Sequence, residues 1–371
     1  MHRRISRSPR HFVTTFFLVI LGLSSSLAAA DDNQHLGLPP VVTPSDYPSN
    51  PAKIALGKKL FFDKRLSGDS SISCASCHQP EHAFSDGKPL AQGIGQRTGT
   101  RNTPSIFNAA FNTSQFWDGR RDTLETQALD PLFNVREHGL KDRHSVLALL
   151  RKDANYVRAF KTAFDVAPDA IELADVGQAL ASFERSELIA GDSPFDRYYF
   201  GGDKSRLSPS AIRGLALFQG AAQCTACHTI SQASALFTDN DFHSLSVGLK
   251  RIEQRLPEIT TRLVRMRASG TNLDQAVLSD EDVAELGRFA VTLKPSDIGK
   301  FRTPSLRNVA LTAPYMHDGS IASLEDAVEL EIYYRGAEAD RPLILTPAEK
   351  TDLVEFLKSL TSPMNAKLDG S

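Results

Sequence analysis

The feature that most constrains this chain is a pentapeptide that occurs twice, as CASCH from Cys74 and as CTACH from Cys224, and that uses all four cysteines. Cys-x-x-Cys-His is the attachment signature of c-type haem: the two thiols bond to the haem vinyl groups, and the histidine becomes an axial ligand of the iron. A fold that carries haem covalently must enclose it, so the sequence predicts a chain built around two c-type haems. The predicted attachment residues are Cys74, Cys77, Cys224 and Cys227, and the predicted iron ligands are His78 (first haem) and His228 (second haem).

Other uses of four cysteines fit this pattern less well. A zinc ribbon needs its two Cys-x-x-Cys pairs about 15–20 residues apart, whereas Cys74 and Cys224 lie 150 positions apart. Neither pair stands in the βαβ pattern of a thioredoxin-like redox protein. Two structural disulfides would suit an oxidising compartment, but they would not require a histidine after each second cysteine. Two haems are therefore the preferred interpretation.

The N-terminus has the order of a secretory signal. The first thirty residues contain four arginines and no acid, and they include the apolar run FVTTFFLVILGL at 12–23 and three alanines at 28–30. A basic region, a short apolar run and small residues at a cleavage site indicate a signal peptide over residues 1–30, and the run is too short to span a bilayer. We expect an exported, periplasmic protein without a membrane span in the mature chain.

Charge and length exclude one class of partner and suggest the number of domains. Removing residues 1–30 takes four arginines from 42 basic and none from 44 acidic side chains, so 38 minus 44 leaves a net charge of −6. Nucleic acid needs a basic surface, so it is not an expected partner. The remaining residues, about 340 in number, exceed one ordinary core and predict two domains.

A weak internal repeat predicts that the two halves are alike. NPAKIALGKKLFFD from Asn50 resembles SPSAIRGLALFQG from Ser208, and each begins with a helix-capping residue followed by proline at the first helical position. Residues 102–125 resemble residues 302–325 at a constant offset of 200, whereas the haem motifs are offset by 150. The second half therefore holds about fifty extra residues, and a charged, helix-prone insertion is expected at about 249–286.

Each half closes with an amphipathic helix. Apolar residues recur at near-helical period over 171–188, and TPAEKTDLVEFLKSL begins with a capping box of Thr346 and Glu349. No segment alternates as a half-buried strand would. The predicted fold class is all-α, with two tandem cytochrome c-like haem domains over residues 31–203 and 204–371.

Further motifs carry a resemblance to a known family. FWDGR at Phe116, RNTP at Arg101, GRFAVT at Gly287 and FRTPSLRNVALTAPYMHDG from Phe301 are similar to segments of the bacterial di-haem cytochrome c peroxidase and MauG family. The resemblance covers nearly all of the mature chain apart from the insertion. It implies a peroxidatic haem in the N-terminal domain and an electron-transfer haem in the C-terminal domain.

The resemblance also assigns residues to the first haem. In classical members a histidine on the loop after this haem closes the open face of the iron, but here the loop reads GIGQRTGTRN, with Gln96 near that place and no histidine between His82 and His138. We therefore expect an open position on the first iron. Glu137 matches the distal glutamate that moves a proton between the peroxide oxygens, and Gln127 matches a residue that shapes the same pocket. His138, the next residue, is an alternative to Glu137 in this role, although it is expected to face outward.

The second haem departs from the methionine ligation of classical members. No methionine lies at the family position, fourteen residues after His317, where Glu331 stands instead. The segment ELEIYYRGA resembles the tyrosine-bearing segment of MauG-type relatives. Tyr333 is therefore the expected sixth ligand of the second iron, with Tyr334 as the alternative.

Two more assignments follow from matching positions. Trp117 in FWDGR matches the family tryptophan between the haems, whose ring can pass electrons. Asn102, Thr312 and Pro314 match positions whose oxygens hold a calcium ion, and ligation by oxygen alone suits that cation.

The expected function is that of a periplasmic di-haem c-type peroxidase, which reduces hydrogen peroxide at the N-terminal haem with electrons relayed through the C-terminal haem. The electron donor would be a small redox protein, either a cytochrome c or a cupredoxin. Two alternatives stay open: a MauG-like oxidase acting on a partner protein, and a non-enzymatic electron carrier in which both irons are fully ligated.

Overall fold

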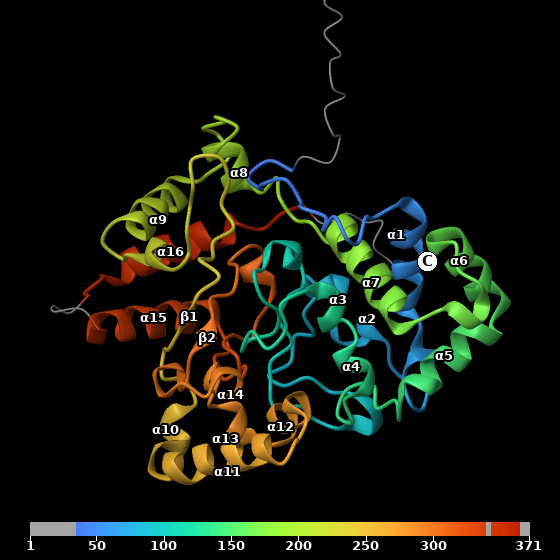
Figure 1. Cartoon of the computed structure of the whole chain (residues 1–371). Coiled ribbons are helices and arrows are strands. Elements are labelled where there is room, and N and C mark those ends of the chain that lie inside the picture. The colour runs from blue at the N-terminus through green and yellow to red at the C-terminus, as the bar shows by residue number, and fades with distance from the viewer. Residues whose placement is uncertain (1–34, 339–342, 364–371) are drawn as a thin grey trace, which may run out of the picture. The chain divides into compact units, whose positions relative to one another are not determined.

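Helices supply nearly all of the regular structure in the computed structural model, which describes residues 35–338 and 343–363 (Figure 1). The helices of the N-terminal half are α1 Pro51–Phe62, α2 Cys74–Cys77, α3 Leu124–Gln127, α4 Asp130–Phe133, α5 Arg143–Lys152, α6 Ala154–Phe164, α7 Leu173–Glu187 and α8 Pro194–Tyr199. Those of the C-terminal half are α9 Pro209–Gln219, α10 Leu249–Ile252, α11 Leu256–Ala268, α12 Leu273–Ser279, α13 Glu281–Ala284, α14 Phe289–Thr292, α15 Leu324–Glu338 and α16 Pro347–Lys358. The two strands β1 Phe242–His243 and β2 Phe301–Arg302 pair antiparallel.

This composition confirms the predicted helical class in its coarser form, a mostly helical fold. The described residues belong to the compact unit Gln34–Ser371. The predicted signal peptide, residues 1–30, lies outside the described residues. Within the described ranges no helix is long and apolar enough to cross a bilayer. The division into tandem domains at residue 203 stays a prediction.

The first hydrophobic core forms where α7 packs on α1 (Figure 1). Leu180 and Phe183 of α7 are buried, as their spacing predicts, and the ring centroids of Phe183 and Phe61 lie 5.3 Å apart. A Cβ on Gly57 of α1 would lie only 1.9 Å from the carbonyl oxygen of Ala179. Glycine at this position therefore lets the two helix backbones touch.

The second core repeats this arrangement with α9 and α16. A Cβ on Gly214 would lie 1.9 Å from the carbonyl oxygen of Asp352. The rings of Phe218 and Phe356, one from each helix, have centroids 5.0 Å apart. The repeat in the sequence thus corresponds to a repeated helix crossing, with glycine at the point of closest approach in both halves.

Capping side chains fix where these helices begin. The side chains of Asn50 and Ser208 accept backbone N–H groups of the first turns of α1 and α9 at 2.8 and 3.1 Å. Thr346 and Glu349 form a reciprocal capping box at the start of α16. All three helix starts confirm the predictions from the sequence.

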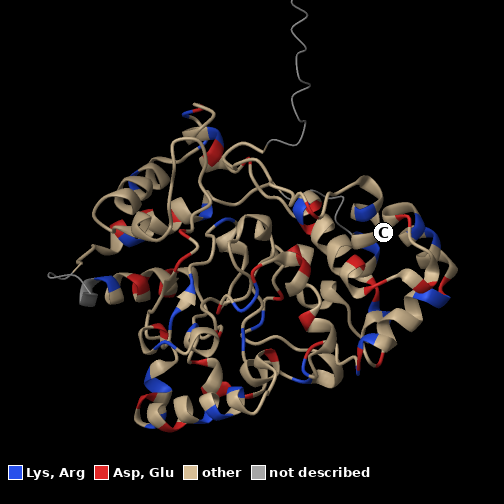
Figure 2. Ribbon diagram, in the orientation of Figure 1, with Lys and Arg blue, Asp and Glu red and all other residues tan. Residues whose placement is uncertain are grey.

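The 249–286 segment, predicted as an insertion, folds as α10–α13 around a small core. The fully buried members of this core from the segment are Ile252, Ile259, Leu263, Val277, Val283 and Leu286. Basic and acidic residues are intermixed along these helices (Figure 2), and Arg251 and Arg255 both pair with Asp282, at 3.0 and 2.8 Å. Apolar packing inside and ion pairs outside explain why so charged a stretch is ordered.

Residues before the predicted boundary at 203 also enter the second core. Phe195 of α8 packs on Phe237 with ring centroids 5.2 Å apart. The buried guanidinium of Arg307 pairs with Asp196, also of α8, at 2.8 Å. The second core therefore includes α8 as well as the C-terminal helices.

Replacing Gly57 by alanine should destabilise the protein, although alanine favours a helix by about 1 kcal/mol over glycine. The added methyl group would force the α1–α7 crossing apart, and overpacking of this kind costs about 1–3 kcal/mol. Urea unfolding of the haem-loaded protein, followed by circular dichroism, measures the change. Gly99→Ala is the matched control, because a Cβ there meets nothing closer than 3.7 Å. A Gly57→Ala variant as stable as the wild type would contradict the close crossing.

Candidate functional site

The first Cys-x-x-Cys-His motif forms a single helical turn followed by a fixed histidine. The turn α2 is held at its start by the backbone N–H of Ser73, which donates to Oγ of Ser76 at 2.9 Å. Nδ1 of His78 lies 2.9 Å from the carbonyl oxygen of Phe84. A carbonyl oxygen only accepts, so Nδ1 carries the proton and Nε2 keeps its lone pair. This tautomer is the one that binds a metal through Nε2.

The second motif orients its histidine in the same way. Nδ1 of His228 donates to the carbonyl oxygen of Phe237 at 2.8 Å. Phe84 and Phe237 both adopt left-handed backbone conformations, with φ of 58° and 53°. Burial lowers the pKa of His228 to about 4, so its imidazole is neutral at physiological pH. Both histidines are thus prepared as neutral Nε2 ligands by the same local structure.

The four cysteines are half-buried, and their thiols are uncharged at neutral pH. Burial raises the pKa of Cys74, Cys77 and Cys224 to about 12, and it also raises the pKa of Cys227. Zinc binding and thiol redox catalysis need the thiolate, which low-pKa sites supply. The environment of these cysteines therefore fits covalent attachment of haem better than it fits a zinc or redox site.

One cavity connects the two motifs. It is lined by every residue that the sequence predicts to hold or assist a cofactor, with the exception of Tyr333. The predicted residues on its walls are Cys74, Cys77, His78, Asn102, Trp117, Gln127, Glu137, Cys224, Cys227, His228, Thr312 and Pro314. The fold therefore brings together side chains that are as much as 240 positions apart in the sequence.

Glu137 is a half-buried acid on the cavity wall. Its Oε2 atom is buried and has no hydrogen-bond partner. Its backbone is held by Ile94, whose N–H donates to the Glu137 carbonyl oxygen at 2.8 Å. Burial, reinforced by the charge of Asp274, raises the pKa of Glu137 to about 8. A carboxyl group with this pKa can both accept and return a proton near neutral pH.

Two further cavity residues were not found from the sequence. His138 is buried rather than outward-facing, because its Nδ1 donates to the carbonyl oxygen of Leu66 at 2.7 Å. Glu184 of α7 is buried with an unpartnered Oε2, and burial raises its pKa to about 8. Glu184 follows Leu180 by one helical turn, so the apolar stripe of α7 was the signal that could have identified it as buried.

Trp117 lies where the two halves of the repeat meet. Its indole N–H donates to the carbonyl oxygen of Asn102 at 3.0 Å, and its own carbonyl oxygen accepts from the N–H of Arg302 at 2.8 Å. The N–H of Asn102 in turn donates to the carbonyl oxygen of His317 at 2.9 Å. Trp117 is therefore fixed by backbone groups of both halves on the wall of the shared cavity.

His317 occupies the corresponding place in the second half of the repeat. Its Nε2 lies 2.8 Å from Oε2 of Glu285, and both side chains are buried. Its ring stacks on Phe301 with centroids 3.7 Å apart and an interplanar angle of 13°. These contacts indicate a structural role for His317, because they hold its ring against the 249–286 segment through Glu285.

The structure does not support Tyr333 as a ligand of the second iron. The side chain of Tyr333 is 62% exposed, and its ring packs on Tyr334 with centroids 5.2 Å apart. The α15 residues that line the cavity are Leu324, Ala327, Val328, Glu331, Ile332 and Arg335. They follow helical spacing along one face, and a helix that presents these residues turns Tyr333 to the opposite side, while Tyr334 is not among the residues that line the cavity.

The donor sets fit two covalently bound haems. Each half offers two neutral thiols and a histidine with its Nε2 free, and both sets open onto one cavity with apolar walls. The three predicted calcium residues also lie on this cavity. The side-chain NH₂ group of Asn102 donates to the carbonyl oxygen of Lys88 at 2.8 Å. The side-chain oxygen of Asn102 is therefore the candidate ligand.

Comparisons with known proteins show the family to which this chain belongs. The model of the di-haem cytochrome c peroxidase family matches residues 51–205. The chain is 34% identical to the cytochrome-c peroxidase IdrP1 of Pseudomonas sp., over 96% of this chain and 93% of that protein. It is 37% identical to the methylamine utilization protein MauG of Methylorubrum extorquens, over 85% of this chain and 80% of that protein.

Solved structures show the same likeness. A MauG-like protein associated with microbial copper homeostasis superposes with a TM-score of 0.72 and 32% identity, over 90% of this chain and 96% of that chain. The diheme peroxidase BthA from Burkholderia thailandensis superposes with a TM-score of 0.66 and 25% identity, over 87% of this chain and 90% of that chain.

Glu184→Gln should stabilise the protein at alkaline pH. The pKa of Glu184 in the folded protein, about 8, lies above the ordinary value of 4.5. The bound proton therefore stabilises the folded wild type fully below pH 4.5, and this stabilisation is lost as the pH rises through 8. The loss is at most about 1.4 kcal/mol per pH unit, and the neutral amide avoids it. Urea unfolding from pH 4 to 9 tests this, with the exposed Glu187→Gln of the same helix as control. Parallel stability profiles for wild type and Glu184→Gln would contradict it.

Proposed function

Because the chain belongs to the di-haem cytochrome c peroxidase family, which includes the MauG proteins, we propose that it reduces hydrogen peroxide to water at its first haem. The observation that carries this proposal is Glu137, whose Oε2 atom is buried without a hydrogen-bond partner on the cavity that the first motif opens onto. A substrate oxygen can become the partner of this atom.

The chain would hold one haem through Cys74, Cys77 and His78 and the other through Cys224, Cys227 and His228. When bound, the first haem supplies an open iron position for peroxide and the second supplies a route for electrons. The cavity-lining residues of the loop after the first motif are Ala91, Gly93, Gly99, Arg101 and Asn102. None of them is a histidine or a methionine, so this loop offers no strong iron ligand, which supports an open position on the first haem.

Glu137 would act as the general acid–base catalyst. Cleavage of the peroxide O–O bond to water requires a proton to leave one oxygen and arrive at the other. The Glu137 carboxylate takes the first proton and returns it to the leaving oxygen. Overall, one peroxide, two protons and two electrons give two waters. Gln127, on the same cavity, is assigned to hold peroxide against Glu137.

Trp117 is assigned to electron transfer between the two sites. Its ring lies on the cavity wall that both motifs share, and hydrogen bonds to Asn102 and Arg302 fix its position. We further propose an exported, periplasmic location, a small cytochrome c or cupredoxin as electron donor, and a calcium ion held by oxygens of Asn102, Thr312 and Pro314.

A MauG-like oxidase that withdraws electrons from a partner protein is the second candidate. An open first haem without a loop histidine favours it, as does 37% identity to a MauG protein over 85% of this chain. The two candidates share the peroxide reaction and differ in whether the electrons come from a redox protein or from residues of a substrate protein.

Glu137→Gln should slow the reaction with peroxide by about 100-fold or more, since the loss of an acid–base group typically costs 10²–10⁴-fold. In the wild type the rate should rise with pH through about 8, because the ionised carboxylate is the form that takes the proton. The variant should lose this pH dependence. Stopped-flow absorption of the haem-loaded protein mixed with peroxide measures both effects.

The control for this experiment is Glu81→Gln, which removes an exposed acid near the first motif. It should keep both the rate and the pH profile of the wild type. A Glu137→Gln variant with wild-type kinetics would remove Glu137 from the proposed mechanism.

The resting ferric protein should give a high-spin electron paramagnetic resonance signal from the first haem. An iron with one strong axial ligand is high-spin, whereas an iron with two strong ligands is low-spin. Two low-spin signals, together with no response to peroxide, would favour the electron-carrier alternative.

A further inference from the structure

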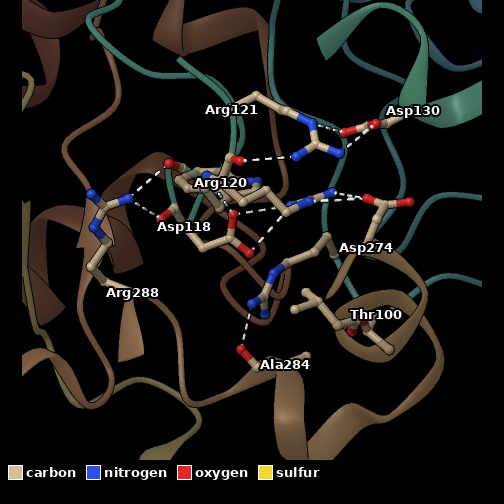
Figure 3. A network of polar contacts seen from close by, with 12 residues as sticks. Thr100, Asp118, Arg120, Arg121, Asp130, Asp274, Ala284 and Arg288 are labelled. Atoms are coloured by element: carbon tan, nitrogen blue, oxygen red, sulfur yellow. Dashed lines mark hydrogen bonds and ion pairs between the residues drawn. The ribbon is translucent and has the colours of Figure 1, made fainter. Parts of the chain in front are cut away.

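The 249–286 segment places a buried acid beside the first-haem side of the cavity. Oδ1 of Asp274 in α12 accepts from Nε and Nη2 of Arg120, at 3.0 and 2.6 Å (Figure 3). Its other oxygen accepts from the side-chain amide of Asn134 at 2.7 Å. Asp274 and Arg120 are both buried, and Arg120 lines the cavity. An acid from the 249–286 segment is thus paired with a residue of the wall that also carries Glu137.

Backbone contacts hold this segment in place. The hydroxyl of Thr100 donates to the carbonyl oxygen of Val277 at 2.8 Å, and the guanidinium of Arg101 donates to the carbonyl oxygen of Ala284. Val277 is also part of the segment's own core. Asp274 is therefore fixed relative to the first half of the chain from two directions, and Figure 3 shows these anchors around the Arg120 network.

Arg120 is shared between two carboxylates. Its Nη1 donates to both oxygens of the fully buried Asp118, at 3.1 and 3.2 Å. Its other two nitrogens are directed to Asp274. Burial alone would lower the pKa of Arg120, but the charges of Asp118 and Asp274 hold it above its usual value. The single positive charge of Arg120 thus lies between the negative charges of Asp118 and Asp274.

The charged groups that affect the ionisation of Glu137 come from α12, from α4 and from the loop that carries Arg120. Asp274 of α12 and Asp130 of α4 oppose its ionisation, and Arg120 favours it. Asp130 is itself paired with Arg121, at 2.6 Å. The nearby thiols of Cys74 and Cys77 become thioethers on haem attachment and no longer titrate. Asp118 and Asp274 together therefore leave one negative charge that Arg120 does not balance.

We propose that Asp274 is a positioning residue of the peroxide site: it engages Arg120 and the side chain of Asn134, a residue whose backbone carbonyl oxygen accepts from the N–H of Glu137, and so it sets the pH at which Glu137 becomes the carboxylate that takes the peroxide proton. This inference rests on the proposed function, and it assigns the 249–286 segment a part in the reaction. Without Asp274, Arg120 would be free to turn to Glu137 and hold it as a carboxylate.

The test is Asp274→Asn in the haem-loaded protein. The pH midpoint of the peroxide reaction should move toward acid by about one unit or more, which corresponds to about 1.4 kcal/mol or more. Infrared difference spectra of the resting ferric protein give a second readout: the protonated-carboxyl band that is absent in Glu137→Gln should titrate at lower pH in Asp274→Asn. Asp274→Glu keeps the charge and should restore the wild-type midpoint.

Asp282→Asn is the matched control, because Asp282 belongs to the same segment but pairs with Arg251 and Arg255 away from the cavity. It should leave the midpoint unchanged. If Asp274→Asn does not accumulate as folded protein, Asp274→Ser is neutral, leaves room for water and carries the same expectation.

The outcomes separate this inference from the proposed function. A wild-type midpoint in the neutral Asp274 variants, with Glu137→Gln still impaired, would overturn the role of Asp274 alone. Wild-type kinetics in Glu137→Gln would overturn both. A shifted midpoint in Asp282→Asn as well as in Asp274→Asn would show a general effect of the segment's charge and would also overturn the specific role of Asp274.

Discussion

The structure depends on two helix crossings at which a glycine lets backbones touch. At the α1–α7 crossing Gly57 faces Ala179, and at the α9–α16 crossing Gly214 faces Asp352, in each case with no room for a Cβ. Each crossing gathers a cluster of phenylalanines, including Phe61 in the first half and Phe218 in the second. These clusters form the apolar side of the cavity that both Cys-x-x-Cys-His motifs line, so the crossings determine where a large cofactor can be enclosed.

The same packing orients the iron ligands. Phe84 and Phe237 are buried in the two cores, and their carbonyl oxygens accept from Nδ1 of His78 and His228. The core therefore fixes the tautomer and direction of each histidine before any metal binds. Such outer contacts govern how a histidine serves as a ligand. In this chain they are repeated with the same residue type in both halves.

The two halves differ in what they place on the rest of the cavity. The first half adds Glu137 and Arg120, and Arg120 is paired with Asp274 of the second half, whereas the second half presents the α15 face that includes Glu331 and Arg335. A duplicated scaffold thus carries two different chemical environments. The difference arises from the 249–286 segment and from α15, neither of which has an equal counterpart in the first half.

Much of the site could be read from the sequence because its signals are local. The haem motifs, the caps at Asn50, Ser208 and Thr346, and the apolar stripe of α7 each lie within a few turns of chain, where residue type and spacing decide the structure. The family resemblance located Glu137 and Trp117, and the structure places both on the cavity.

Other features were decided only by the tertiary structure, because they depend on burial and on contacts between distant segments. His138 was expected outside and is buried; Tyr333 was expected on the iron and is largely exposed, since a helix can turn only one face to the cavity. The pairing of Asp274 with Arg120 joins residues 154 positions apart. A sequence names the charged groups, but their electrostatic effect depends on how close they lie and how much water the fold removes around them.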